Sequence, residues 1–168
     1  EMAWQLRGLE TFLQDFILNP DIPHYIMERL TDILIEIGRR ALDAGQGRFD
    51  MVYLYDDVAT QQSLLFSKKM WAKFIRPYHE KIMSLAARHD LSVMYHCDGA
   101  VRPLIPEFIE IGIKVLNPVQ SDAKDMDFER LKGDFGDRLA FHGGIDITHV
   151  LPYGSPDEVR LAVQDCIK

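Results

Sequence analysis

The sequence predicts an α/β fold, a TIM-like (β/α)8 barrel of which about four β/α units are present, in a single domain over residues 1–168. Two observations predict this class. Strand-like segments alternate with helical segments, which is typical of a parallel sheet with right-handed crossovers. Each strand is also followed by polar residues or glycines, as expected when ligands bind at the C-terminal face of a barrel.

An open doubly wound sheet is the competing architecture, and the distribution of polar residues disfavours it. Such a sheet would concentrate its chemistry at one switch point, whereas here every expected strand ends in a polar or glycine cluster. No G-x-G-x-x-G segment follows a strand, and no Walker A lysine is present. The sequence therefore argues against the usual dinucleotide and P-loop sites.

Helices are expected before the first strand. Apolar residues recur at helical spacing between Trp4 and Phe16, and Asn19-Pro20 ends this helix. A second helix starts around Asp21, a candidate N-cap, and ends at Gly45.

The first expected strand is Met51–Tyr55, which is apolar on both faces, as in a strand buried within a parallel sheet. Pro77 should kink the long helix that follows or split it in two. The last helix begins at Ser155, which is expected to form a capping box with Glu158. The other expected elements are strands 91–95, 114–116 and 138–141 and short helices 103–111 and 127–131.

The composition argues against several classes of partner and location. The net charge is -7 and no basic stripe appears on any expected element, so nucleic acid is not an expected partner. No apolar stretch approaches the roughly 20 residues that span a bilayer. Two cysteines are too few for a disulfide framework, which indicates a reducing, cytoplasmic location. The chain begins without methionine inside a helical pattern, so we expect it to be part of a longer protein.

His96 and Asp98 are the sharpest candidate pair for metal binding. Side chains two residues apart in an extended segment point the same way, so an imidazole and a carboxylate would converge above the barrel mouth. A zinc-type ion accepts these donors, although catalytic zinc sites usually have three protein ligands. Cys97 would point the opposite way if the strand geometry persists, whereas a turn at Gly99 could re-aim it. The alternative is that both side chains only hydrogen-bond to neighbouring loops.

Asp56 and Asp57 end the first strand, and one of them should face the barrel interior while the other faces the helix layer. The inward residue could orient a substrate, transfer a proton or bind a metal. We expect this role for Asp57, with a purely local loop role as an equal alternative.

Residues at the ends of the third and fourth expected strands are candidates for substrate binding. Asn117 and Gln120 carry hydrogen-bonding amides, although a local Asn-Pro turn would also explain Asn117. His142 is followed by Gly143, which lets a backbone approach a ligand closely, and Asp146 lies just beyond. His142 could equally be a packed histidine at a strand end.

Five segments, taken in order, resemble the uroporphyrinogen decarboxylase superfamily, which also contains zinc-dependent methyltransferases that act with a corrinoid. They are DDVATQ at 56–61, FIRPY at 74–78, HCDG at 96–99, LNPVQ at 116–120 and GGID at 143–146. The resemblance covers most of the chain after residue 50 and implies a TIM-like barrel, of which this chain would supply the middle and later part.

The sequence departs from both branches of the superfamily. His96 matches the histidine of the His-x-Cys-Gly metal motif of the methyltransferases, but Asp98 stands where their first cysteine would be. A carboxylate there argues against thiol alkylation without excluding a metal. True decarboxylases carry an arginine-rich region with a catalytic aspartate near the N-terminus, which this chain lacks. Their DSWAG and GNLDP patterns are replaced by DDVAT and GGID.

The resemblance implies, as the leading hypothesis, a methyltransferase-like enzyme that moves a methyl group between a small-molecule substrate and a corrinoid on a partner protein. Asp57 and His96 would be catalytic, and His96 and Asp98 would hold zinc. Decarboxylation of uroporphyrinogen in porphyrin biosynthesis is the alternative, and a non-catalytic binding barrel is the third possibility. Because four strands leave both sheet edges open, a homo-oligomer is also expected.

Overall fold

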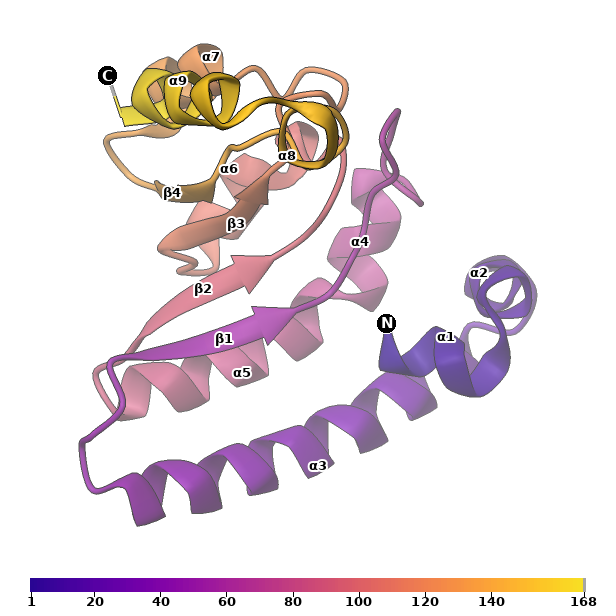
Figure 1. Ribbon diagram of the computed structural model, residues 1–168. Coiled ribbons are helices and arrows are strands. Elements are labelled where there is room, and N and C mark those ends of the chain that lie inside the picture. The colour runs from indigo at the N-terminus through magenta and orange to yellow at the C-terminus, as the bar shows by residue number, and fades with distance from the viewer. Residues whose placement is uncertain (168) are drawn as a thin grey trace.

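The computed structural model describes residues 1–167 and confirms the predicted α/β class. Within these residues, four strands form one parallel sheet in the order β1-β2-β3-β4 (Figure 1). This consecutive order, without a reversal, is that of a barrel wall rather than of a doubly wound sheet. The strands are β1 (Met51–Tyr55), β2 (Ser92–His96), β3 (Val115–Val119) and β4 (Ala140–Gly143).

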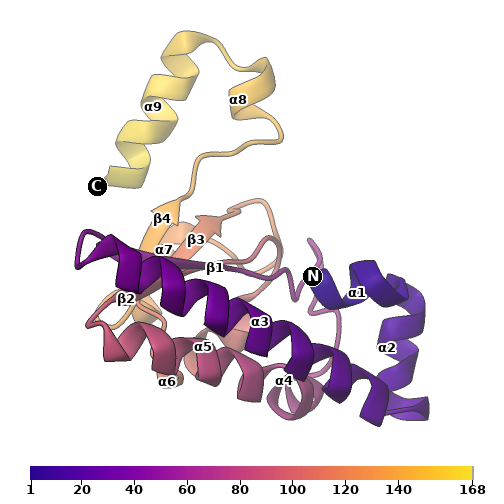
Figure 2. The same cartoon turned by 90° about the horizontal axis from the view of Figure 1, so that it is seen from below.

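A layer of helices covers one face of the sheet. Helices α3 to α6 lie on one side of the strands, whereas α8 and α9 extend beyond the end of β4 on the other side (Figure 2). None of the helices in residues 1–167 is long and apolar enough to cross a membrane. The helices are α1 (Met2–Arg7), α2 (Leu9–Leu18), α3 (Asp21–Gly45), α4 (Lys68–Phe74), α5 (Arg76–Arg88), the 3-10 turn η1 (Arg102–Leu104), α6 (Ile105–Glu110), α7 (Phe128–Phe135), α8 (Val150–Tyr153) and α9 (Pro156–Ile167).

The core lies between the sheet and this helix layer. Trp71 of α4, Tyr95 of β2 and Phe108 of α6 are fully buried, and the ring centroids of Tyr95 and Phe108 lie 4.6 Å apart. Val93, also on β2, is buried in the same core. Successive residues of a strand point to opposite faces. His96 therefore points to the face that the helices do not cover, which we call the inner face.

The N-terminal helices differ from the prediction. The sequence predicts one helix from Trp4 to Phe16, but the helix is divided at Gly8, whose φ of 82° interrupts the helical backbone. Apolar spacing does not reveal such a break, because glycine adopts this conformation without the cost that other residues incur. Helix α3 begins at Asp21 as predicted, yet Pro20 occupies the N-cap position, so Asp21 is not the cap.

Two predictions from local sequence patterns, a split helix and a capping box, are confirmed. The long helix is split at Ile75 into α4 and α5, with Pro77 in the first turn of α5, where its missing N–H group costs no hydrogen bond. The predicted capping box precedes α9. The Ser155 N–H donates to Glu158 Oε2 at 2.7 Å, and the Glu158 N–H donates to Ser155 Oγ at 3.4 Å.

The prediction that the first strand is buried on both faces is wrong. Met51, Tyr53 and Tyr55 are 37%, 56% and 52% exposed, whereas Val52 and Leu54 pack against the hydrophobic core. The inner face of β1 therefore stays largely open to solvent. A strand that is apolar on both faces has the same sequence pattern whether or not a second layer covers it, so the pattern could not distinguish these cases.

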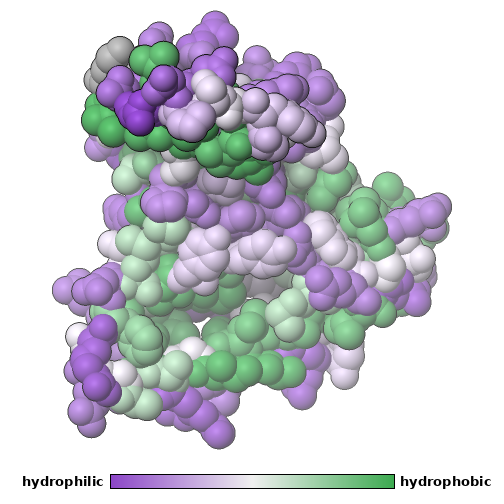
Figure 3. Space-filling view, in the orientation of Figure 1, coloured by the Kyte–Doolittle hydropathy of each residue, from purple (hydrophilic) through white to green (hydrophobic). Residues whose placement is uncertain are grey.

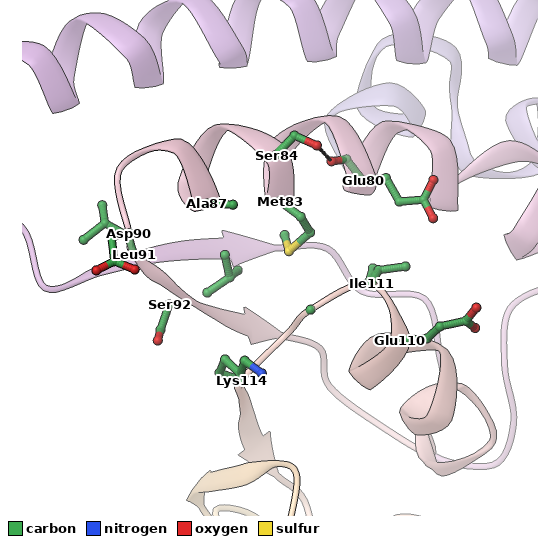
Figure 4. Close-up of a pocket in the computed structure, with 12 residues that line it drawn as sticks. Glu80, Met83, Ser84, Ala87, Asp90, Leu91, Ser92, Glu110, Ile111 and Lys114 are labelled. Carbon is green, nitrogen blue, oxygen red and sulfur yellow. Dashed lines mark hydrogen bonds between the residues drawn. The ribbon is translucent and has the colours of Figure 1, made fainter.

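Two of the cavities in the described part of the chain help to locate the site. Hydrophobic side chains gather along α3 and the adjacent part of the sheet (Figure 3), and a cavity of about 260 Å³ lies there, lined in part by Leu30 and Leu54. A larger cavity of about 710 Å³ opens between α5 and α6, lined in part by Met83 and Ile111 (Figure 4). The larger cavity sits at the amino-terminal ends of β2 and β3, away from the strand ends that carry the predicted functional residues.

The open sheet generates a testable prediction about association. Within residues 1–167, β1 and β4 each lack a strand neighbour on one side, and exposed edges readily pair with other chains. We therefore expect residues 1–168, produced alone, to self-associate at micromolar concentration in sedimentation velocity. Met51→Lys, which places a charge on the open face of β1, should weaken that association. A compact, stable monomer that does not associate would contradict the half-barrel interpretation.

Candidate functional site

The predicted functional residues meet at the carboxyl-terminal edge of the sheet. Strands β2, β3 and β4 extend one to three residues further than predicted, so His96, Asn117 and His142 lie within the strands. Tyr55 pairs in register with His96, and His96 pairs with Asn117. Because paired residues of neighbouring strands share a face, the side chains of these residues lie side by side on the inner face.

Asp57, His96 and Asp98 form a cluster of potential metal ligands. His96 Nε2 lies 3.9 Å from Asp57 Oδ1 and 3.9 Å from Asp98 Oδ2. One ligand atom from each residue lies within 4.8 Å of the other two, and all three side chains are half-buried. Ligand atoms of a tetrahedral ion at about 2.1 Å lie roughly 3.4 Å apart. The cluster therefore needs only a small contraction to close around an ion.

The two aspartates after β1 point to opposite faces, as predicted. Asp56 is 9% exposed and turns into the helix layer, where its Oδ2 lies 3.2 Å from His79 Nε2. Burial acts to raise the pKa of Asp56, but the hydrogen bond and charge of His79 act to lower it. Tyr95 donates a hydrogen bond to the Asp56 carbonyl at 2.8 Å. These contacts hold Asp56 outward and leave Asp57 facing the inner side.

The turn after β2 is held by hydrogen bonds that aim Asp98 inward. The Asp98 N–H donates to Asp57 Oδ1 at 2.7 Å, and the Gly99 N–H donates to Gln120 Oε1 at 2.8 Å. The Gln61 amide also donates to Gln120 Oε1, at 2.7 Å. Gln120 is only 8% exposed, so the structure places it beneath the turn as a support. Substrate binding by Gln120 stays a prediction.

Cys97 points away from the cluster, as strand alternation predicts. The thiol is fully buried, and its Sγ accepts a hydrogen bond from the Val58 N–H at 3.4 Å. Burial raises the pKa of Cys97 well above its ordinary value, so the metal-binding thiolate form is disfavoured. The cluster of Asp57, His96 and Asp98 thus offers one nitrogen and two oxygen donors.

Asn117 links side chains from all four strands. Its Oδ1 accepts a hydrogen bond from the Tyr53 hydroxyl at 3.0 Å and lies 3.0 Å from His96 Nδ1. Its Nδ2 lies 2.6 Å from His142 Nδ1. Two predicted substrate-binding residues, Asn117 and His142, are therefore connected to the candidate metal ligand His96.

Gly143 and Asp146 occupy the backbone just beyond this network. Gly143 has a φ of 100°, and a Cβ atom there would lie 3.0 Å from Pro118 Cβ, so glycine permits the close approach of β4 to β3. Asp146 accepts hydrogen bonds from the His149 and Thr148 N–H groups at 2.8 and 2.7 Å. The His149 and Thr148 hydrogen bonds lower the pKa of Asp146 to about 2. These contacts of Asp146 are local to the turn before α8.

Two tyrosines belong to the site although the sequence did not identify them. The Tyr53 and Tyr55 rings lie 6.1 and 5.0 Å from the His96 ring. A hydrogen bond to the Glu1 carboxylate, with burial, raises the pKa of Tyr55 to about 12. Both tyrosines alternate with the aliphatic residues Val52 and Leu54, and this alternation is the sequence pattern that could have identified them. The site is thus acidic and lined by aromatic rings.

Comparisons with known proteins agree with this fold. The family model described as uroporphyrinogen decarboxylase (URO-D) matches residues 2–168. The chain is similar to a methylated-thiol–coenzyme M methyltransferase of Methanosarcina mazei, with 24% identity over 166 residues, which cover 99% of this chain and 42% of that protein. The chain therefore spans less than half the length of this relative. No solved structure matches the chain.

The turn that carries Asp98 can be tested by substitution of Gly99. A Cβ atom at position 99 would lie 2.4 Å from the Thr60 carbonyl oxygen, and the φ of Gly99 is 82°. Gly112 is a matched control, because its φ is 100° but nothing lies within 4 Å of a Cβ there. We expect urea unfolding to show a loss of about 1–2 kcal/mol for Gly112→Ala and a clearly larger loss for Gly99→Ala. Equal losses would contradict the close packing of this turn.

Proposed function

Because the chain belongs to the uroporphyrinogen decarboxylase family, whose members are enzymes with a TIM-like barrel, we propose that this protein is a methyltransferase. It moves a methyl group between a small substrate and a corrinoid carried by a partner protein. The similarity to a protein named as a methyltransferase supports this choice within the family.

The observation that carries the proposal is the convergence of Asp57, His96 and Asp98 at the barrel mouth. One imidazole nitrogen and two carboxylate oxygens are donors that suit zinc or a similar divalent ion. When bound, such an ion would supply the Lewis acidity that activates a substrate heteroatom. All three candidate ligands are half-buried, so none of them is sealed inside the core.

The residues of the chain have separable roles in this proposal. His96 and Asp57 are the catalytic residues, since they reach the reacting centre and can hold an ion or accept a proton there. Asp98 completes the ligand set. The small substrate binds against residues contributed by β3, β4 and the turns that follow, namely Asn117, Gln120, His142, Gly143 and Asp146.

The aromatic side chains beside His96 support a corrinoid as the second substrate. A methyl acceptor that must also release the methyl group is the work of a cobalt corrinoid rather than of a side chain. The rings of Tyr53 and Tyr55 lie beside His96 and offer flat aromatic surfaces for contact with a planar ring system. We therefore propose a corrinoid protein as the partner and the reducing cytoplasm as the location.

Decarboxylation of uroporphyrinogen is the second candidate, because the matching family model has that description. A substrate with many carboxylates needs cationic groups. Arg102, the arginine nearest the strand ends in the sequence, forms an ion pair with Asp134 and lies 5.5 Å from the centre of the Phe135 ring. The carboxylates of Asp57 and Asp98 would repel an acidic substrate. The pairing of Arg102 with Asp134 and the negative charge of the site favour methyl transfer over decarboxylation.

Metal content tests the ligand assignment. The intact protein should retain about one zinc-type ion per chain after dialysis, and His96→Ala should lose it, because a catalytic site with three ligands does not survive the removal of one. His89→Ala, which changes a half-buried histidine at the end of α5, is the matched control and should retain the ion. Elemental analysis that finds equal metal in the wild type and in His96→Ala would reject the assignment.

Turnover separates the two chemistries. We expect the intact protein to transfer a methyl group from a methoxy or methylamine compound to reduced cobalamin, which is followed by the visible spectrum of the corrinoid. We expect no conversion of uroporphyrinogen, which is followed by chromatography for coproporphyrinogen. Formation of coproporphyrinogen at an enzyme-like rate would reverse this ranking.

A further inference from the structure

The side-chain amide of Asn117 connects the candidate metal ligand His96 with His142. Asn117 lies between His96 on β2 and His142 on β4, and it also receives the Tyr53 hydroxyl from β1. A carboxamide has one acceptor end, its oxygen, and one donor end, its NH₂ group. Its orientation therefore determines which nitrogen of each neighbouring histidine carries the proton.

On the β2 side the amide presents its oxygen. Asn117 Oδ1 lies 3.0 Å from His96 Nδ1 and accepts from Tyr53 at 3.0 Å. Because an oxygen without a proton can only accept, His96 must carry a proton on Nδ1 to make this contact. In the neutral imidazole, the lone pair is then on Nε2, the atom that lies 3.9 Å from Asp57 and Asp98 carboxylate oxygens.

On the β4 side the amide presents its NH₂ group. Asn117 Nδ2 lies 2.6 Å from His142 Nδ1, so Nδ1 of His142 must be the unprotonated acceptor. The proton of the neutral His142 ring is then on Nε2. Because this side chain is exposed, the Nε2–H group is free to donate to a ligand at the barrel mouth.

We propose that Asn117 is a positioning residue that holds His96 and His142 in opposite tautomers, His96 as a lone-pair donor and His142 as an N–H donor. This inference deepens the proposed function and rests on it for its purpose. His96 then accepts a cation or a proton at Nε2, and His142 supplies a hydrogen bond to an acceptor atom of the substrate. In this arrangement Asn117 acts on the reacting atoms through the two histidines.

The chemistry of the position explains why an amide is needed there. An aspartate would offer only acceptors, and an aliphatic side chain would offer neither group. The register of β2 and β3 pairs His96 directly with Asn117, so the short asparagine side chain already lies beside the imidazole. A hydrogen-bond partner behind a ligating histidine fixes both its tautomer and its ring orientation.

Tautomers can be read directly from ¹⁵N shifts of histidine-labelled intact protein without metal, at a pH about two units above the ordinary histidine pKa of roughly 6.5. The resonances are assigned with His96→Gln and His142→Gln. We expect His96 as the Nδ1–H form, which is the less favoured form of a free imidazole, and His142 as the Nε2–H form. An Nε2–H form for His96, or a mixture of both forms, would overturn the proposal.

The variant Asn117→Asp gives a result that a merely structural role would not produce. Both oxygens of the carboxylate can only accept hydrogen bonds. His96 should therefore keep its Nδ1 proton, while His142 changes from the Nε2–H to the Nδ1–H form. Tyr53→Phe is the matched control, because it removes one donor to Oδ1 and should leave both tautomers unchanged. If His142 keeps its Nε2–H form in Asn117→Asp, the donor half of the proposal is refuted.

Zinc titration of the same proteins separates this inference from the proposed function. Asn117→Leu should weaken zinc binding by about 10–100-fold, as expected on loss of the partner behind a ligating histidine, whereas Asn117→Asp should not. Predicted tautomers in a wild-type protein that binds no zinc would support the role of Asn117 and refute the metal site. Zinc binding by the wild type with the opposite tautomers would do the reverse.

Discussion

The in-register pairing of β1, β2 and β3 is the constraint on which the site depends. Tyr95 and Cys97 pack into the core, so alternation sends His96 and Asp98 to the opposite face of the sheet. The same register places Asn117 beside His96. A slip of one residue would bury His96 and expose Tyr95, because the side-chain period of a strand is two. The packing that stabilises the sheet therefore also selects the residues of the site.

Two adjacent, identical residues show how the environment separates structural from chemical roles. Asp56 is buried beside His79 and fixes the end of β1, whereas Asp57 faces the inner side and meets His96. Removal of one partner from a buried hydrogen bond leaves the other partner unsatisfied and costs about 1–3 kcal/mol, so Asp56 contributes to the stability of the fold. Asp57 is half-buried, is held by the Asp98 N–H and lies beside His96, which places its carboxylate in the candidate site.

Local chemistry made much of the fold predictable, whereas long-range contacts did not. The split at Pro77 and the capping box at Ser155 follow from a residue's own backbone chemistry, and the structure has both. The pairing of His96 with Asp98 also followed from strand alternation alone. The roles of Tyr53 and Asn117 did not, because their hydrogen bond joins residues 64 positions apart. Such a contact depends on the strand register and on which face of β1 stays open.

We propose that oxygen and nitrogen ligands, rather than thiolates, dominate a metal centre formed by Asp57, His96 and Asp98. X-ray absorption of the zinc-loaded intact protein tests it most directly. The arrangement of Asp57, His96 and Asp98 predicts a first shell with nitrogen and oxygen neighbours at about 2.0–2.2 Å in the majority. A shell dominated by sulfur at about 2.3 Å would contradict it.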